Sequence, residues 1–200
     1  MHPTTGRPRS TAADEAIRAA TLELLAEGPQ AVTFEGVALR AGVAKTTVYR
    51  RYRTRGELLF RTLLHDRPRP APDTGSLRGD VRALLEGFTA VFRSDAGRRG
   101  VFGIIDALER DEDFRDGYIA GFMQAEHAVA DAVVRAAVAR GELPRPVAAA
   151  RVRAIVIGPA LIHCALYRER PAAALLDELT EEALGALRAA AQRGPDPVGA

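Results

Sequence analysis

The stretch Thr33–Tyr52, TFEGVALRAGVAKTTVYRRY, decides the fold of this 200-residue chain. Its apolar residues recur at helical spacing on both sides of Gly42, and glycine readily adopts the left-handed conformation that ends a helix. The pattern predicts two short helices, Phe34–Ala41 and Lys45–Tyr52, joined by a very tight turn, with Thr33 capping the first. This spacing is that of a helix–turn–helix, whose second helix enters the major groove of DNA.

The first turn of that second helix holds Lys45, which is the only lysine among 28 lysines and arginines. A compact ammonium on a flexible stem suits a point contact with one phosphate, although random placement of one lysine is the alternative. Thr46 and Thr47 offer hydroxyls to base edges or to the backbone, and their methyl groups suit thymine. Tyr49, one turn later, is placed to donate its hydroxyl to a phosphate. The predicted DNA-contact residues are Lys45, Thr46, Thr47, Tyr49, Arg50 and Thr33.

The same residues, followed by Thr54–Leu59 (TRGELL), resemble the DNA-binding domain of the TetR family of transcriptional regulators. In that family a threonine opens the second helix, Ala-Gly-Val marks the turn, and Lys-x-[Ser/Thr]-[aliphatic]-Tyr leads to a capped fourth helix. The resemblance extends over residues 11–65 and implies that Lys45 and Tyr49 grip phosphates. The chain differs at Arg55-Gly56, where the family frequently has Lys-Glu or Lys-Asp, and this departure bears on operator preference rather than on the fold.

A short basic segment precedes the first predicted helix. Gly6–Arg9, GRPR, resembles the basic arm that many members of this family carry, and its Arg7 and Arg9 would reach the DNA backbone or minor groove. A solvated, disordered tail is the alternative. Residues 1–68 hold 11 basic and 7 acidic side chains, whereas the remainder holds 17 and 19. This asymmetry favours a polyanionic partner for the N-terminal part.

Helical periodicity continues along the rest of the chain, and no segment has the alternating pattern of a strand, so the predicted fold class is all-α. The proline-rich stretch Arg67–Pro72 predicts a short, stiff linker between two parts. We therefore expect a helix–turn–helix DNA-binding domain at 1–66, including a basic arm at 1–10, then a helical effector-binding and dimerisation domain at 73–193. The tail 194–200 is predicted to be disordered. The other predicted helices are residues 12–27, 54–65, 77–92, 98–110, 112–140, 146–168 and 175–192.

The last two predicted helices favour a homodimer. The helix at 146–168 is apolar nearly all round, and such a helix must be buried on all sides. The helix at 175–192 is amphipathic, with Leu184 and Leu187 on its apolar face. The TetR resemblance implies that these two helices form a four-helix bundle with those of a second subunit. Burial of both helices inside one subunit is the alternative.

The resemblance also implies a ligand-responsive transcriptional regulator, expected to be a repressor that a small apolar molecule releases from its operator. Aromatic faces with one or two polar tips suit such a ligand, and the alternative is that these side chains only fill the core. An architectural DNA-binding protein without a ligand is the second reading, but it would not need a large second domain. The predicted pocket residues are Phe88, Phe92, Phe102, Tyr118, Phe122 and His163.

Motifs and composition weigh against enzyme, metal and membrane chemistry. His163 and Cys164 are adjacent, and neighbouring helical residues do not face each other, so catalysis is not expected. No metal-ligand spacing or cofactor motif is present. One cysteine excludes an internal disulfide framework, and with no secretory signal this predicts a cytoplasmic protein. The longest apolar run, Ala154–Ile162, falls short of the roughly 18–20 residues that span a bilayer, so no membrane partner is expected.

Overall fold

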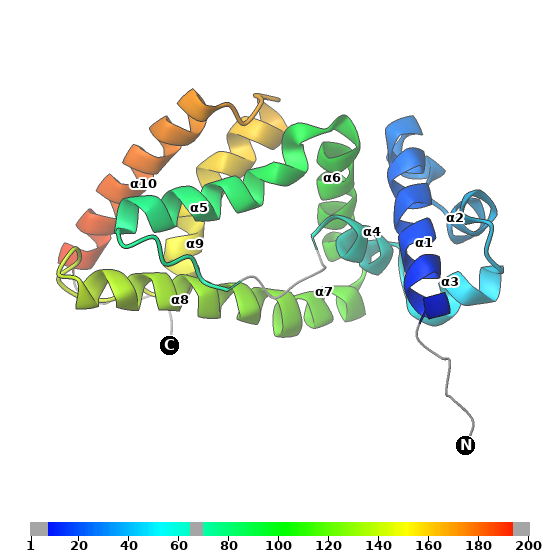
Figure 1. The fold of residues 1–200 in the computed structure, drawn as a ribbon, viewed down its shortest axis with the longest axis horizontal. Coiled ribbons are helices and arrows are strands. Elements are labelled where there is room, and N and C mark those ends of the chain that lie inside the picture. Colours follow the sequence, from blue (N-terminus) through cyan, green and yellow to red (C-terminus); the bar gives the residue numbers. More distant parts are fainter. Residues whose placement is uncertain (1–7, 65–69, 194–200) are drawn as a thin grey trace, which may run out of the picture. The chain divides into compact units, whose positions relative to one another are not determined.

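The computed structural model describes residues 8–64 and 70–193, and over these residues the chain is helical with no strand, which confirms the all-α prediction (Figure 1). Contacts divide the described residues into two compact units. The head unit comprises residues 8–64 and 94–116, and the body unit comprises residues 70–93 and 117–193. Most of the predicted arm, including Arg7, part of the linker and the tail lie outside the described residues and stay predictions.

Helices alone build both units. The head contains α1 (Pro8–Glu27), η1 (Pro29–Ala31), α2 (Phe34–Ala41), α3 (Lys45–Arg51), α4 (Arg55–Leu63), α6 (Asp95–Arg110) and the first residues of α7 (Glu112–Tyr118). The body contains α5 (Leu77–Thr89), η2 (Ala90–Arg93), η3 (Ile119–Met123), α8 (Gln124–Ala139), α9 (Ala149–Leu161), η4 (Ile162–Leu166) and α10 (Ala173–Gln192). Segments η1 and η2 are 3₁₀ turns, whereas η3 and η4 are π-helical turns.

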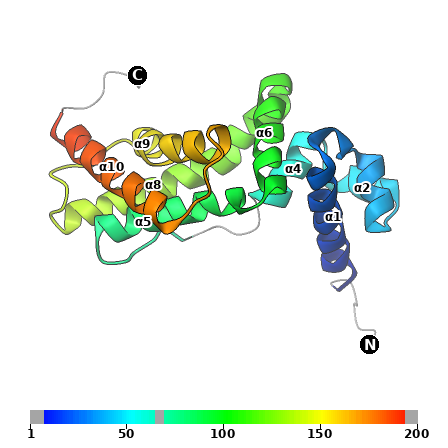
Figure 2. The ribbon, with the colours of Figure 1, turned by 90° about the horizontal axis from the view of Figure 1, so that it is seen from above.

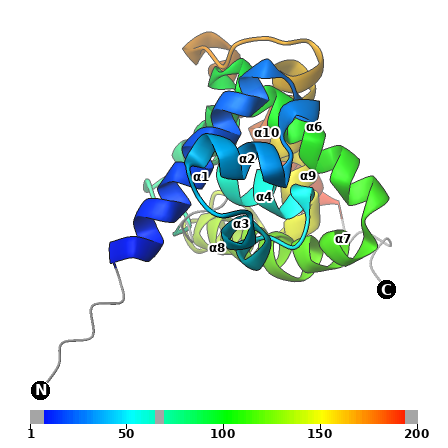
Figure 3. The ribbon, with the colours of Figure 1, turned by 90° about the vertical axis from the view of Figure 1, so that its right-hand side faces the viewer.

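Local side chains and one glycine set the ends of the short helices in the head. Thr33 caps α2 by accepting a hydrogen bond from the Gly36 backbone N–H at 3.0 Å. Gly42 ends α2 in the left-handed region with φ 64°, and its N–H bonds back to α2 carbonyls. Thr54 caps α4 in the same way, accepting from the Glu57 N–H at 3.2 Å. The predicted helix–turn–helix of α2 and α3 is therefore confirmed (Figure 3).

One apolar core joins the first four helices. Helix α2 packs against both α1 and α3, and α4 packs against α1. Burying an aliphatic side chain of this kind stabilises a fold by about 1.5–3 kcal/mol. The largest fully buried side chains of this core are Ile17, Leu25, Val37, Val48, Leu58 and Leu59.

Helix α6 packs on the head, although its place in the sequence falls within the expected second domain, 73–193. Glycines make room for this contact between α4 and α6. A Cβ on Gly56 would lie 2.6 Å from the Cβ of Ala107, closer than side chains approach. Gly100 and Gly103 likewise leave room for leucine side chains of α4. Packing against α6 therefore explains why glycine stands at position 56, where the family frequently has an acidic residue.

In the body unit, α10 lies against α5 and α9, and α9 also packs on α5 and α8 (Figure 2). The apolar stripe of α10 faces these neighbours. Leu184 and Leu187 are 2% and 0% exposed within a single subunit. The expectation that these two leucines contact a second subunit is therefore wrong, because the subunit's own core already covers them.

Helix α9 with its π-helical end, η4, differs from α10, because the subunit leaves part of its apolar surface uncovered. We expected this helix to be buried on all sides. Within one subunit, however, only 28% of the residues in Ala149–Leu166 are buried. Val152 and Val156 attach one face to the bundle, whereas Ile162 and Leu166 are 43% and 62% exposed. With a mean hydropathy of 1.5, this segment is long and apolar enough, by length and composition alone, to cross a membrane, contrary to the expectation that no run is long enough.

Three helices begin three or four residues away from their predicted starts, and α10 begins two residues early, at Ala173. Proline suits a first helical turn, where its missing N–H would be unpaired, and α1 accordingly begins at Pro8. Helix α6 begins early because Ser94 accepts a hydrogen bond from the Gly97 N–H at 3.0 Å. Helix α9 begins late, after the non-helical segment that buries Leu143 and Val147. The predicted starts were Ala12, Arg98 and Pro146, and the observed starts are Pro8, Asp95 and Ala149.

Candidate nucleic-acid interface

Helix α3 presents polar side chains to solvent over a buried anchor. Val48 is fully buried and fixes α3 against the head core. Tyr49 keeps 54% of its surface exposed although it follows Val48 directly. This alternation leaves the polar face of the helix free for a partner. The exposed side chains of α3 are Lys45, Thr46, Tyr49 and Arg50, and Thr47 is half-buried.

Several arginines elsewhere in the head are neutralised by carboxylates. Arg40 on α2 reaches back to α1, where its two terminal nitrogens lie 3.2 Å and 2.8 Å from carboxylate oxygens. These contacts hold helices together and leave little free positive charge. The paired groups are Arg40 with Glu23 and Glu27, Arg51 with Asp14, and Arg61 with Glu57.

The cations on and just after α3 are different. Lys45, Arg50 and Arg53 are exposed and have no carboxylate within ion-pair distance among the described residues. Arg18 on α1 shares this property, whereas Arg55 and Arg99, which also lack a carboxylate, bond to backbone carbonyls of the head. An unpaired cation on a surface is available to a phosphate, and such contacts supply the sequence-independent part of DNA affinity. The exposed and unpaired cations of α2–α4 therefore lie on and just after α3, while the unpaired Arg55 at the start of α4 is half-buried against the Pro29 carbonyl.

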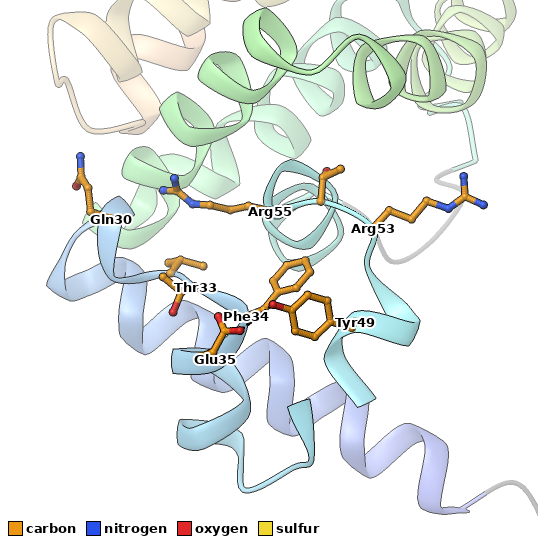
Figure 4. A pocket seen from close by; sticks show the side chains of 9 residues that line it. Gln30, Thr33, Phe34, Glu35, Tyr49, Arg53 and Arg55 are labelled. Carbon is orange, nitrogen blue, oxygen red and sulfur yellow. Dashed lines mark hydrogen bonds between the residues drawn. The ribbon is translucent and has the colours of Figure 1, made fainter. Parts of the chain in front are cut away.

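Arg53 was missed by the sequence reasoning, which stopped at the end of the recognition helix. It stands directly after Tyr52, the residue that ends α3, and its side chain is exposed. In Figure 4 it points away from the other labelled side chains. Arg55 behaves differently, because its guanidinium reaches the carbonyl oxygen of Pro29. The charge of Arg53 alone, beside the motif, was the signal available in the sequence.

A shallow open groove lies between the starts of α2 and α4 and the end of α3 (Figure 4). Its volume is about 290 Å³. Both helix starts are already capped by threonines, so the groove offers side-chain groups more than free backbone donors. The lining residues are Gln30, Val32, Thr33, Phe34, Glu35, Tyr49, Arg53, Thr54 and Arg55.

Tyr49 and Glu35 are hydrogen-bonded across this groove. The Tyr49 hydroxyl donates to Oε1 of Glu35 at 2.7 Å, and the Tyr49 ring meets the Phe34 ring edge-on at 4.8 Å between centroids. The Tyr49 hydrogen bond, with a smaller contribution from Lys45, lowers the pKa of Glu35. The same hydrogen bond raises the pKa of Tyr49. In the free chain, therefore, the one hydroxyl proton of Tyr49 is already committed to a carboxylate.

Thr33 and Arg9, two further predicted contact residues, lie at the starts of α2 and α1. The Thr33 hydroxyl oxygen accepts the capping hydrogen bond of α2, and the side chain stays exposed at the edge of the groove. Arg9 belongs to the first turn of α1, so the helical backbone begins inside the segment expected to be a basic arm. The structure therefore groups Thr33 with α3, whereas Arg7 lies outside the described residues.

Four of the predicted pocket aromatics form two pairs in the body unit. The ring centroids of Phe88 and Phe92 lie 5.5 Å apart, and those of Tyr118 and Phe122 lie 5.2 Å apart. Phe92 is buried, and burial raises the pKa of the Tyr118 hydroxyl. These pairs therefore contribute to the interior of the body.

The other two predicted pocket residues lie elsewhere. Phe102 belongs to α6 in the head unit, where it is 41% exposed. His163 lies in η4, with Nδ1 3.2 Å from a carboxylate oxygen of Glu169 and its ring against Tyr167. Cys164 beside it is fully buried, with its thiol pKa raised by burial. Within the described ranges, no group of three or more His, Cys, Asp or Glu side chains is placed to hold a metal ion.

A helix–turn–helix with unpaired cations on its second helix, followed by a separate helical body, defines a DNA-binding transcriptional regulator rather than an enzyme. Residues 17–62 match the family model of bacterial regulatory proteins of the tetR family. Residues 71–183 match the model of the tetracyclin repressor-like C-terminal domain. The chain belongs to the TetR family of transcriptional regulators.

Individual relatives agree with this assignment. The chain is 32% identical over 144 residues to YdeS, an uncharacterized HTH-type transcriptional regulator of Bacillus subtilis (strain 168), covering 69% of this chain and 71% of the relative. A crystal structure of the TetR family regulator SCO0332 superposes with a TM-score of 0.62 at 30% identity, covering 88% of this chain and 97% of the other. A TetR family regulator from Pseudomonas syringae pv. tomato str. DC3000 shares the fold at 20% identity, with a TM-score of 0.56 and coverage of 90% and 95%.

Proposed function

We propose that this chain is a ligand-responsive, sequence-specific regulator, acting as a homodimeric repressor that a small apolar molecule releases from its operator. The observation that carries the DNA-binding part is the contrast between free and neutralised cations in the head. Lys45, Arg50 and Arg53 lack carboxylate partners, whereas Arg40 and Arg51 are paired. The free cations suit phosphates on either side of the major groove.

The exposed first turn of α3 would contact the base edges. Thr46 is exposed and Thr47 is half-buried, so both hydroxyls and methyl groups are available to base edges. Thr33 adds a polar group at the start of α2, and the segment containing Arg7 and Arg9 reaches the DNA backbone or minor groove. The repressor is expected to work in the cytoplasm, where it meets its operator.

The dimer is supported by half-buried apolar side chains of α9 and by the exposed Ile162 and Leu166 of η4. In Ala149–Leu166, a segment of mean hydropathy 1.5, only 28% of the residues are buried, and a second subunit would cover the apolar side chains that are left partly exposed. Two glycines indicate where a helix of the second subunit would approach closely. A Cβ on Gly158 of α9 or on Gly185 of α10 would meet nothing within 4 Å in the subunit. Since mid-helix glycine costs about 1 kcal/mol relative to alanine, close approach of a partner helix gives these two a purpose.

An effector site is supported by the aromatic pairs of the body. Phe88, Phe92 and Phe122 offer apolar faces, and Tyr118 adds a hydroxyl. The half-buried ion pair of Arg153 with Glu126 acts electrostatically on Tyr118 and supplies a polar end to this region. Apolar walls with a few placed polar groups are the usual make-up of a small-molecule site.

Coupling between ligand and DNA is supported by the position of α6 in the head unit. Helix α6 packs on α1 and α4, and the chain passes between head and body at Arg93–Ser94 and again at Asp116–Gly117. A ligand that changes the conformation of the body at η2 or η3 would therefore act on the two points where the chain enters and leaves the segment that carries α6. A shift between two head spacings would then release the operator, and by linkage operator DNA would weaken ligand binding equally.

Selection of bound duplexes from a randomised pool, together with genomic footprinting of the purified protein, tests this function. The expected result is an inverted repeat whose half-sites are centred one helical turn, or a multiple of it, apart. Footprints upstream of neighbouring genes would then indicate the effector. Recovery of no enriched sequence by the intact dimer would overturn the proposal.

A further inference from the structure

Glu35 is the carboxylate of α2–α4 that has no arginine partner among the described residues. Glu57 and the three carboxylates of α1 that contact the helix–turn–helix are each used by an arginine. Glu35 is exposed, is acted on electrostatically by the unpaired Lys45, and accepts its hydrogen bond from the neutral phenol of Tyr49. A negative charge therefore lies on the same face as the unpaired cations that suit a polyanion.

The position of this carboxylate is fixed. The Tyr49 ring packs edge-on against Phe34, the residue before Glu35, while the Tyr49 hydroxyl holds Oε1 at 2.7 Å. Tyr49 occupies Oε1, and the Glu35 backbone N–H also interacts with this carboxylate, whose remaining lone pairs can still accept a hydrogen bond. The lowered pKa keeps the group ionised at neutral pH and therefore a pure acceptor.

An ionised carboxylate at a DNA surface is repelled by phosphates and attracted by base amino groups. In the major groove these donors are N4 of cytosine and N6 of adenine, and adenine presents the acceptor N7 beside N6. The second carboxylate oxygen would face the acceptor N7 on adenine itself, whereas the neighbouring group on cytosine itself is C5–H, which is not an acceptor. Cytosine is therefore the better partner for Glu35.

We propose that Glu35 reads a cytosine in each half-site of the operator, and that Tyr49 is the positioning residue that holds its carboxylate at the base. This inference rests on the proposed DNA-binding function and adds one residue of α2 to the reading surface. It also assigns Tyr49 a different role from a phosphate contact. A phenol has one proton to donate, so Tyr49 serves either Glu35 or a phosphate, not both.

The test is the same duplex selection from a randomised pool, carried out with Glu35→Gln, Tyr49→Phe and, as a charge-matched control, Glu15→Gln. Glutamine pairs with N6 and N7 of adenine, so Glu35→Gln should replace cytosine by adenine at one symmetric position of the site. Its affinity for the wild-type site should fall about tenfold per half-site. Tyr49→Phe should weaken the cytosine preference at the same position and leave the salt dependence unchanged. Glu15→Gln, on α1, should leave every base preference unchanged.

The opposite results are equally clear. Tighter binding of Glu35→Gln to all sequences alike would mean that Glu35 faces a phosphate, and this would overturn the proposal. Unchanged preferences in Glu35→Gln would do so too. A uniform loss of affinity in Tyr49→Phe would return Tyr49 to the phosphate role. If the wild-type chain selects no sequence, the regulator proposal itself fails, which is a different outcome from wild-type selection that Glu35→Gln does not alter.

Discussion

Arg140 and Asp80 form an ion pair of 2.9 Å in the body unit, and the side chain of Asp80 has no exposed surface. The same carboxylate accepts hydrogen bonds from the backbone N–H and the hydroxyl of Thr74, at 2.7 Å and 2.8 Å. Asp80 thereby joins the segment before α5, the helix α5 itself and the end of α8. Removing one partner of such a buried pair leaves the other groups without their acceptor.

Asp80→Ala is expected to lower the free energy of unfolding by about 3 kcal/mol, measured by urea denaturation. The control is Asp131→Ala, which removes an exposed carboxylate 3.9 Å from Arg135 and should cost less than about 1 kcal/mol. Equal effects of the two substitutions would contradict the structural role given to Asp80.

A neighbouring carboxylate gives the body unit a pH dependence. The Arg140 guanidinium, helped by the Leu77 N–H, holds the pKa of Glu142 below its ordinary value of 4.5. Because the folded pKa is the lower one, Glu142 stabilises the fold above the unfolded pKa, and this contribution is lost as the pH falls through the folded pKa. Glu142→Gln should therefore be less stable than wild type at neutral pH, and the gap should close on acidification. A gap that stays constant down to about pH 3 would contradict this assignment.

The contact of α4 with α6 depends on glycine. Gly56→Ala should destabilise the head by about 1–3 kcal/mol, because the added methyl overlaps Ala107 and presses on Phe114. Gly117→Ala in α7 is the matched control, since a Cβ there meets nothing within 4 Å and should stabilise by up to about 1 kcal/mol. Thermal unfolding compares the two. A Gly56→Ala variant as stable as wild type would show that α4 and α6 can separate at little cost.

The dimer face has a direct test that does not disturb the subunit core. Gly158→Leu and Gly185→Leu add a side chain to open space within the subunit, so each subunit should stay folded. If these glycines lie at close approach to a partner helix, sedimentation should show monomers in place of the wild-type dimer. Ala128→Leu, an exposed position on α8, is the control and should remain dimeric. Dimers in both glycine variants would move the interface elsewhere.

Local features of the fold could be predicted from the sequence because their causes are local. The caps by Thr33 and Thr54 and the left-handed Gly42 each act within a few residues, so the helix–turn–helix was predictable. The placement of α6 with the head depends on Gly56 and Gly100, which meet side chains far away along the chain. No periodic pattern carries that information.

The sequence pattern also could not predict which surface covers the apolar face of the last helix. An amphipathic stripe shows that Leu184 and Leu187 are covered, but it does not say whether the cover belongs to the same subunit. Within the candidate site, residue type and spacing led to the prediction of Lys45 and Thr46 as DNA contacts. They did not identify Arg53 or the bond from Tyr49 to Glu35, because these depend on which side chains are left without partners after folding.

The measurement that tests the central claim most directly is the salt dependence of operator binding by Lys45→Ala and Arg40→Ala. Lys45 is free and Arg40 is neutralised by two carboxylates, so only the lysine should contribute a phosphate contact. The slope of log K against log salt should lose about 0.9 per contact, or about 1.8 for two heads, in Lys45→Ala. Arg40→Ala should keep the wild-type slope. An unchanged slope in Lys45→Ala, or an equal loss in both variants, would contradict the assignment of the free cations to DNA phosphates.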